Sequence, residues 1–344
     1  MAARKQPRLP PIPNPPPGPQ RSAPPSTTQG KIPFDPANFD ITGETAYWLW
    51  GELDATSVPL IVLHGGPGAT HKGNEALSLL HTDYGIPVIM YDQMGCGGST
   101  RFRERKGDEA LWTPELFIDE LANLIAYFQA QHGIKHVDLI GHSWGARLGA
   151  MFAYTQHPAI RKLVVGNVGT GMKDGHAVRE KAREALPEDI KAVFRRAKEG
   201  EKVPPEELEA AVFYEFGNFL CRVRPWPDHV LNMFDTVRED DTVYSTMYGF
   251  NAGGSLPRKP NDFMEKDLHK ITAKTVPGGM LVVSGRYDNY TSETMQKWFT
   301  VPTCKVMWVR FGLSSHSIMQ EEPEEYLETL GFFLKMANPS VVGS

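Results

Sequence analysis

The segment Gly141-His142-Ser143-Trp144-Gly145 carries the pattern glycine-x-serine-x-glycine. It directly follows the apolar run at 137–140 and leads into a helix-forming stretch at 146–153. A serine on a sharp turn between a strand and a helix exposes its hydroxyl and can serve as a nucleophile. Such a short pattern often arises by chance, but the flanking strand and helix are the context that it requires. We therefore predict that Ser143 is the nucleophile of a serine hydrolase.

A serine hydroxyl needs a general base, and His316 is the best placed of the eleven histidines. It lies in the loop 312–317, between the last strand-like run and the final helix-forming stretch. Asp288 follows the preceding strand-like run and completes the chain order serine, aspartate, histidine. We expect it to accept a hydrogen bond from the imidazole and to stabilise the imidazolium. Asp174 is an alternative acid, although it lies further from the end of its strand.

The transition state of acyl transfer needs donors for a developing oxyanion, usually backbone N–H groups. The N–H of Trp144, directly after the nucleophile, is one candidate. The pair Gly65-Gly66 ends the first buried strand-like run and lets the backbone approach a substrate closely. We predict Gly66 as the second donor and Gly65 as a substrate contact. The glycine-rich loop 92–99 has a structural role in this interpretation, with Asp92 binding backbone groups near the histidine-glycine loop.

The elements that must position these residues alternate along the chain. Short apolar runs typical of buried parallel strands occur at 59–63, 87–91, 137–140, 162–165, 280–283 and 305–309. Helix-forming stretches lie between them, one opening at Thr113-Pro114-Glu115 and the last covering 324–336. This alternation predicts an α/β fold with a doubly wound, mostly parallel sheet.

One region interrupts the alternation and contains only helix-forming stretches, at 177–185, 188–197, 205–220 and 227–237. We interpret 171–261 as a helical cap inserted between two strands, above their carboxyl ends. A helical subdomain packed away from the site is the alternative. The core is then formed by 33–170 and 262–344. Residues 1–32 contain many prolines, which predict a disordered, extended tail. The alternative is that this segment is a ligand for a polyproline-binding domain.

The bulk properties exclude several classes of protein. The 344 residues are 41% hydrophobic, enough for a sizeable core, and the formal net charge of -5 without a basic block argues against nucleic acid as a partner. The sequence contains no run of about 18 apolar residues, so we predict no membrane span. Three widely spaced cysteines, Cys96, Cys221 and Cys304, fit neither a disulfide framework nor a zinc site. We expect reduced thiols in a cytoplasmic protein, and no metal or cofactor.

The motifs together resemble the proline iminopeptidase family of α/β-hydrolases. The resemblance covers about residues 35 to 336 and rests on a few short segments. These are His64-Gly65-Gly66-Pro67-Gly68, the loop that begins Asp92-Gln93, Gly141 to Gly145, Gly285-Arg286-Tyr287-Asp288, and His316. It implies an α/β-hydrolase fold and release of an N-terminal residue, often proline, from small peptides or amides.

The resemblance also implies carboxylates that bind the free amino group of the substrate. The family typically has a glutamate directly after the triad aspartate and another at the end of the cap, whereas this chain has Asn289 and Ala252 there. Glu215 or Glu207 could substitute, with plain solvent exposure as the alternative for each. Aromatic side chains of the cap could form a pocket for an apolar acyl group, or could simply pack together. The candidates for substrate contact are Phe213, Tyr214, Glu215 and Trp226.

Three functions remain open at this stage. The first is an aminopeptidase or amino-acid amidase that acts through an acyl-enzyme. The second keeps the chemistry but acts on esters or lactones, a hypothesis motivated by the missing glutamates. The third is a non-catalytic ligand-binding protein on a hydrolase scaffold. Epoxide hydrolases and dehalogenases are excluded because they need an aspartate at position 143.

Overall fold

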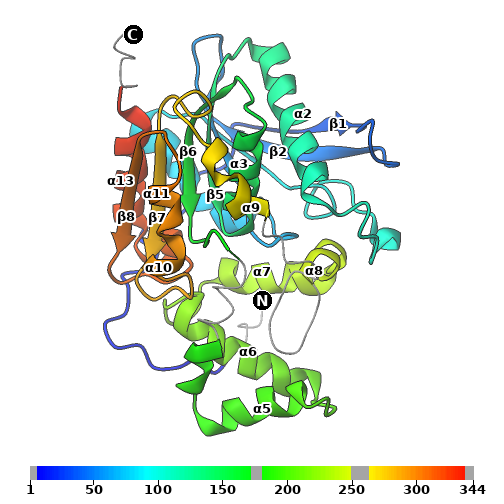
Figure 1. Ribbon diagram of the computed structural model, residues 1–344, viewed down its shortest axis with the longest axis vertical. Helices are drawn as coiled ribbons and strands as arrows, with labels where there is room; N and C mark the ends of the chain where they lie inside the picture. The colour runs from blue at the N-terminus through cyan, green and yellow to red at the C-terminus, as the bar shows by residue number, and fades with distance from the viewer. Residues whose placement is uncertain (1–5, 172–179, 249–262, 338–344) are drawn as a thin grey trace.

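A computed structural model describes residues 6–171, 180–248 and 263–337, which build one central sheet and a group of helices beside it (Figure 1). The sheet has eight strands in the order β1-β2-β4-β3-β5-β6-β7-β8. The first hairpin joins the sheet antiparallel through β2 and β4, and all later pairings are parallel. The strands are β1 Thr28–Phe34, β2 Gly43–Trp50, β3 Leu60–Leu63, β4 Val88–Tyr91, β5 Val137–His142, β6 Ile160–Gly166, β7 Met280–Gly285 and β8 Val306–Phe311.

The central strands are apolar along their whole length because both faces of the sheet are covered. All four residues of β3 are buried, and its side chains alternate between two hydrophobic clusters. Ile61 and Leu63 join the cluster on one face, whereas Leu60 and Val62 join the cluster on the other. This alternation is the reason that continuous apolar runs, rather than apolar and polar residues in turn, marked these strands in the sequence.

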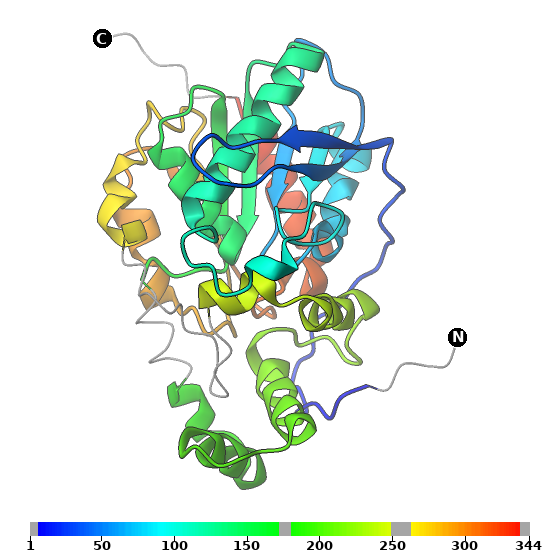
Figure 2. The same ribbon diagram turned by 90° about the vertical axis from the view of Figure 1, so that its right-hand side faces the viewer.

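Helices pack on each face and complete the two clusters (Figure 2). The helices α2 (Pro114–His132) and α3 (Trp144–Tyr154) contribute to the first cluster, and α1 (Leu79–Tyr84) and α13 (Pro323–Lys335) to the second. Shorter elements connect them: η1 His71–Ser78, η2 Arg103–Arg105, α9 Phe263–Asp267, η3 Leu268–Lys270, α10 Ser292–Met295, α11 Lys297–Thr300 and α12 Ile318–Glu321. The predicted doubly wound α/β architecture is confirmed.

Four of the described helices between β6 and β7, called here the cap helices, lie beyond the carboxyl ends of the strands (Figure 1). They are α5 Glu188–Lys198, α6 Pro205–Phe219, α7 Asp228–Glu239 and α8 Thr242–Tyr248. Three of them coincide with predicted helical stretches to within two residues at each end. The backbone N–H of His316 donates to the carbonyl of Phe219, at 2.9 Å, so this helical region contacts the loop of the candidate base.

The prediction of a disordered tail over residues 1–32 is wrong for the described part. Strand β1 already begins at Thr28, inside the predicted tail. Residues 6–27, called here the N-terminal strap, run extended from the cap helices along the core to β1 (Figure 2). Gln6 forms two hydrogen bonds with the backbone of Trp226, and Arg21 binds the carboxylates of Asp83 and Glu324. A proline-rich segment can be extended and still be fixed, provided that other segments supply its hydrogen-bond donors.

Candidate active site

Ser143 lies on a strained turn between β5 and α3. Its φ and ψ of 55° and -118° lie outside the regions that L-residues usually adopt. Two glycines make the turn possible: a Cβ atom at Gly141 would overlap the carbonyl of Gly145, and one at Gly145 would overlap the carbonyl of Leu63. The strand, the turn and the helix are thus packed backbone against backbone, which is why the motif requires glycine at both positions.

His316 and Asp288 form a buried pair at the carboxyl edge of the sheet. The Nδ1 atom of His316 lies 2.9 Å from Oδ2 of Asp288. Because a carboxylate only accepts, Nδ1 is the protonated nitrogen and Nε2 remains the acceptor. The side chain of Asp288 is fully buried and that of His316 is only 10% exposed, so both are largely shielded from water. The arrangement is that of a general base oriented by a carboxylate.

Asn167 is part of this pair's surroundings, and sequence reasoning missed it. Its Nδ2 atom donates to Oδ2 of Asp288 at 2.8 Å and to the carbonyl of Ser315 at 3.0 Å. Directly after β6, Asn167 adopts a positive φ of 52°, a conformation that asparagine tolerates better than most residues. An asparagine immediately after a buried strand is the signal that could have indicated a role. The alternative acid, Asp174, lies outside the described residues.

The nucleophile turn and the histidine loop are in contact through His142. Its Nε2 atom donates to the carbonyl of His316 at 2.6 Å, and the two imidazole rings lie 4.6 Å apart. Burial and the neighbouring His316 lower the pKa of His142 to about 3. His142 is therefore neutral at physiological pH and acts as a structural donor to the loop of His316.

Gly65, predicted as a substrate contact, lies next to the nucleophile turn, and Gly66, the predicted oxyanion donor, directly follows Gly65. A Cβ atom placed on Gly65 would lie 3.5 Å from Cβ of Ser143, and Gly66 has a positive φ of 112°. Trp144 is the first residue of α3, so no carbonyl of the same helix can accept a hydrogen bond from its backbone N–H. This geometry allows the backbone N–H groups of Gly66 and Trp144 to bind an oxyanion, and that role stays a prediction.

The loop after β4 locks these parts together. The indole of Trp144 donates to Oε1 of Gln93 at 2.8 Å, and Nε2 of Gln93 donates to the carbonyl of His64 at 3.1 Å. The backbone N–H of Gln93 donates to Nε2 of His64, at 2.9 Å. Burial lowers the pKa of His64, which keeps its imidazole neutral and able to accept. Three consecutive strand ends are therefore connected by side chains that fix the nucleophile turn.

Asp92 connects the loop after β4 to the first residue of η1. One carboxylate oxygen accepts from the N–H and the Nδ1 of His71, at 2.7 and 2.8 Å, and the other accepts from the N–H of Gly98. Burial alone would raise the pKa of Asp92, but the hydrogen bonds from His71 outweigh it and keep the pKa below its ordinary value. A structural role was expected for this aspartate, and its partners are of the kind that role requires.

The four candidate substrate residues of the cap lie in packed surroundings. Phe213 packs edge-on against Trp226, with ring centroids 5.6 Å apart, and both contact Phe234. Tyr214 is buried with other apolar side chains of α5 and α6. Mutual packing, the alternative weighed for these aromatic side chains, therefore describes them, and a direct role in substrate binding stays a prediction.

Glu215 is neither exposed nor unpaired. It is 1% exposed, and Arg183 binds both of its carboxylate oxygens, at 2.7 and 3.2 Å. Solvent exposure, the alternative considered for this residue, is therefore wrong. Glu207 is bound by Arg196 at 2.7 Å. A carboxylate that is already neutralised by an arginine is a weaker partner for a substrate ammonium group. Ala252, where the family has its second glutamate, lies outside the described residues.

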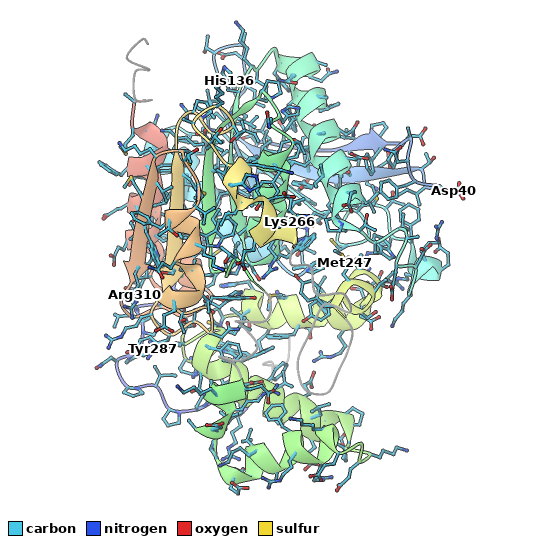
Figure 3. The ribbon with its side chains drawn as sticks, viewed as in Figure 1. Asp40, His136, Met247, Lys266, Tyr287 and Arg310 are labelled. Carbon is cyan, nitrogen blue, oxygen red and sulfur yellow. The ribbon has the colours of Figure 1, made fainter. Side chains whose placement is uncertain are left out.

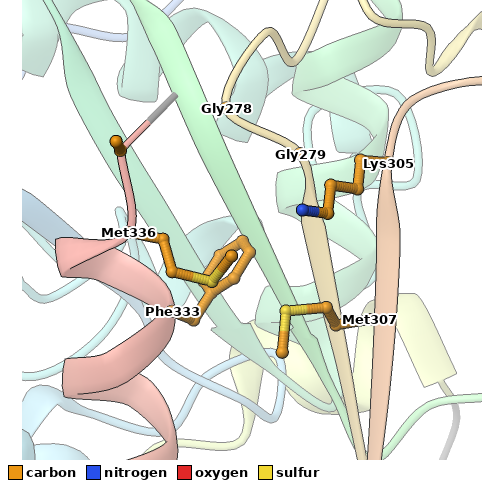
Figure 4. Close-up of a pocket in the computed structure, with 7 residues that line it drawn as sticks. Gly278, Gly279, Lys305, Met307, Phe333 and Met336 are labelled. Carbon is orange, nitrogen blue, oxygen red and sulfur yellow. The ribbon is translucent and has the colours of Figure 1, made fainter. Parts of the chain in front are cut away.

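Within residues 6–171, 180–248 and 263–337 no cluster of three potential metal ligands occurs, and no helix is long and apolar enough to cross a lipid bilayer. The three cysteines are buried and not disulfide-bonded. A small hollow lies at the amino ends of β7 and β8, at the edge of the sheet opposite Ser143 (Figure 4). Its lining residues are Gly278, Gly279, Lys305, Met307, Phe333, Met336 and Ala337.

Comparison with known proteins agrees with this fold. The model of the alpha/beta hydrolase fold family matches residues 58–323. A proline iminopeptidase of Heyndrickxia coagulans is 29% identical over 296 residues, which are 86% of this chain and 97% of that protein. The crystal structure of VinJ superposes with a TM-score of 0.80 at 31% identity and covers 91% of this chain and 100% of its own. The crystal structure of a proline iminopeptidase from Mycobacterium smegmatis gives a TM-score of 0.76 at 29% identity, with 89% and 97% covered. The chain belongs to the alpha/beta hydrolase fold family, and its relatives include proteins named proline iminopeptidase.

Proposed function

We propose that this protein is a serine hydrolase that cleaves an N-terminal aminoacyl bond, of the prolyl type, in a small peptide or amide. The single observation that carries the proposal is the Ser143 turn beside the buried pair of His316 and Asp288. The strained turn, the tautomer of His316 and the glycine loop are the parts that acyl transfer needs. The relatives named proline iminopeptidase support the aminoacyl substrate.

In the proposed reaction the Oγ atom of Ser143 attacks the substrate carbonyl while its proton passes to Nε2 of His316. The negative charge on the carbonyl oxygen is stabilised by the N–H groups of Gly66 and Trp144. The tetrahedral intermediate then collapses, the C–N bond breaks, and His316 gives its proton to the leaving amine. Water, deprotonated by His316, hydrolyses the acyl-enzyme and restores Ser143. Asp288 stabilises the imidazolium in both steps.

A second candidate function is hydrolysis of a small apolar ester or lactone. It is favoured by the absence of the expected amine-binding carboxylates: Asn289 follows the triad aspartate, and Glu215 is paired with Arg183. A site without a desolvated carboxylate would hold an ammonium group poorly. The chemistry of Ser143 would be the same, and only the recognition of the acyl group would differ.

Three chromogenic substrate panels separate these candidates. The panels are free-amine aminoacyl anilides of proline, alanine, leucine and phenylalanine, their N-acetyl versions, and p-nitrophenyl esters, with Ser143→Ala as the blank. Turnover of the free-amine anilides alone supports the proposed function. Equal rates on free and acetylated anilides contradict it, and turnover of esters alone favours the second candidate.

Labelling with a fluorophosphonate tests the remaining alternative, a non-catalytic ligand-binding protein. A reactive Ser143 together with turnover of any panel would exclude that alternative. An unreactive Ser143 in a folded chain would instead favour it, because a fluorophosphonate needs only an activated serine and no particular acyl group.

A further inference from the structure

Arg222 lies where four separate segments of the chain meet. It follows α6 in the cap, and its side chain reaches the histidine loop 312–317, the loop after β7 and the N-terminal strap. Although it is charged, it is only 3% exposed. We propose that Arg222 is a positioning residue for the catalytic base His316, and that the N-terminal strap supplies part of its anchorage. The inference rests on the proposed function, since it assigns His316 a role in catalysis.

The guanidinium of Arg222 is held on several sides at once. One terminal nitrogen donates to the carbonyl of Leu313, in the histidine loop, and the other donates to the carbonyl of Pro13, in the strap, at 3.1 Å. Its plane covers the ring of Tyr287, with the central carbon 3.6 Å from the ring centroid. A planar cation on an aromatic face is a favourable arrangement, and more so when it is desolvated. Tyr287 directly precedes Asp288 and lies at the edge of the core that faces the cap (Figure 3).

The backbone of Arg222 is tied to the same loop through Glu321. One oxygen of the Glu321 carboxylate accepts from the N–H of Arg222 and from the hydroxyl of Ser315, each at 2.6 Å. The other oxygen accepts from the N–H of Ser315, also at 2.6 Å. Glu321 is completely buried, and burial raises its pKa to about 7. Arg222 therefore binds Leu313, and Glu321 binds Ser315, the residue directly before His316.

The strap covers this pair from outside. Its prolines have carbonyl acceptors but no N–H donors, so a docking surface for it must supply donors. Arg222 and Arg224 do so, at Pro13 and Pro10, with Nε of Arg224 lying 3.3 Å from the Pro10 carbonyl. The N–H of Gly18 donates to the carbonyl of Glu321 at 3.0 Å. The strap therefore contacts both Arg222 and Glu321.

Only one of the two arginines reaches the catalytic loops. The other bonds of Arg224 go to carbonyls of the cap itself, at Gly217, Cys221 and Val223. Both arginines bind strap carbonyls, but Arg222 alone of the pair stacks on Tyr287 and binds Leu313 in the described structure. Arg224 is for this reason a matched control for effects that come from the cap or the strap in general.

The expected consequence is a change in the reactivity of Ser143 rather than in the fold. A base displaced by about 1 Å can lose on the order of a hundredfold in rate. In Arg222→Met the methionine keeps apolar contact with Tyr287 but removes the donors to Leu313 and Pro13. We expect the rate of fluorophosphonate inactivation to fall about 10- to 100-fold. The low-field proton resonance of the Nδ1–H of His316 should broaden, and Arg222→Lys should recover part of the rate.

Arg224→Met is the control, and we expect its inactivation rate to stay within about twofold of the wild-type rate. The proposal is overturned if Arg222→Met keeps the wild-type rate and resonance, or if Arg224→Met loses as much as Arg222→Met. Thermal unfolding of each chain shows whether it is folded. If Arg222→Met does not fold, Arg222→Lys decides: a lower rate at an unchanged unfolding midpoint supports the proposal, and a wild-type rate overturns it.

The probe also separates this inference from the proposed function. Fluorophosphonate reactivity does not depend on which acyl group the natural substrate carries, so a wrong substrate class leaves the comparison intact. If the wild-type chain itself is not labelled, the proposed function fails. The His316 resonance of the wild-type and Arg222→Met chains then still decides: an altered resonance in the variant supports positioning by Arg222, and an identical one contradicts it.

Discussion

The catalytic edge of the sheet and the helical cap are held by different kinds of contact. At the edge, backbone packs against backbone at Gly141 and Gly145, and buried hydrogen bonds fix each chemical group. In the cap, an aromatic cluster around Trp226 and many ion pairs between partly exposed side chains hold the helices. Backbone packing permits few substitutions, whereas side-chain clusters can be rebuilt with other residues. The edge therefore tolerates few changes of sequence, whereas the cap helices can be rebuilt with other residues.

The largest expected effect is at the edge, in Asp288→Asn. The amide removes the negative charge that stabilises the imidazolium of His316. Its NH2 group would also face donors in either orientation, since Asn167 and His316 donate to one oxygen and the N–H of Tyr290 to the other. We expect kcat to fall about 10³- to 10⁴-fold with little change in the unfolding midpoint. Asp40→Asn, at an exposed position, is the control; a loss below tenfold for Asp288→Asn would argue against its role.

The next effect is in the cap, in Trp226→Ala. Trp226 is 1% exposed and stacks on Phe234, so truncation leaves a large cavity. We expect a cost of about 3–5 kcal/mol in local stability. Hydrogen exchange should accelerate in α6 and α7 and stay unchanged in β5 and α3. Phe332→Ala, at a position 63% exposed, should have little effect on exchange. Equal acceleration in β5 would show that the cap and the edge unfold as one unit.

A smaller effect is the pH dependence of stability that Glu120, in α2, contributes. Burial raises the pKa of Glu120 to about 8, from an ordinary value of 4.5. Between these values the folded chain holds a proton that the unfolded chain has lost, so this residue's contribution is complete below about pH 4.5 and is lost as the pH rises to about 8. Glutamine can mimic the protonated acid beside Thr45 and the N–H of Met94.

We therefore expect the stability advantage of Glu120→Gln over the wild type to be roughly 3–4 kcal/mol larger at pH 8.5 than at pH 5. Denaturant unfolding at the two pH values measures this difference. Glu321 also has a raised pKa, but it is present in both chains and cancels in the comparison. Exposed Glu52→Gln should show no such dependence on pH. A constant difference between pH 5 and pH 8.5 would mean that Glu120 is ionised in the folded chain.

The smallest effect is expected on the surface of the cap, in Arg238→Ala. Arg238 pairs with Glu209 and Asp235, and all three side chains are about half exposed. Water screens such pairs, so the free energy of unfolding should change by no more than about 0.5 kcal/mol. A loss several times larger would show that ion pairs, as well as aromatic packing, hold the cap together.

The parts of the molecule that the sequence predicted are those determined by local constraints. Continuous apolar runs marked the buried strands, and the two glycines around Ser143 have a steric reason that operates within a few residues. The chain order of Ser143, Asp288 and His316 follows from the sheet topology, so the contact between the last two was foreseeable. The N-terminal strap was not foreseeable, because its order depends on donors from Arg222 and Arg224, which lie about 210 residues away.

Side-chain partners across long sequence separations also explain what was missed in the site. The two bonds of Asn167 join segments more than 120 residues apart, and the burial of Glu215 depends on Arg183 in another part of the cap. An aromatic stretch in an amphipathic helix has the same pattern whether it lines a pocket or packs inside. For Phe213 and Trp226 only the structure shows that the rings contact one another.

The most direct test of the central claim is titration of the protein with a limiting fluorophosphonate, followed by turnover assays and mass mapping of the label. The account predicts one equivalent of label on Ser143 alone and a linear fall of turnover to zero as the label approaches that equivalent. Turnover that persists after Ser143 is fully labelled, or loss of turnover with the label on another residue, would contradict it.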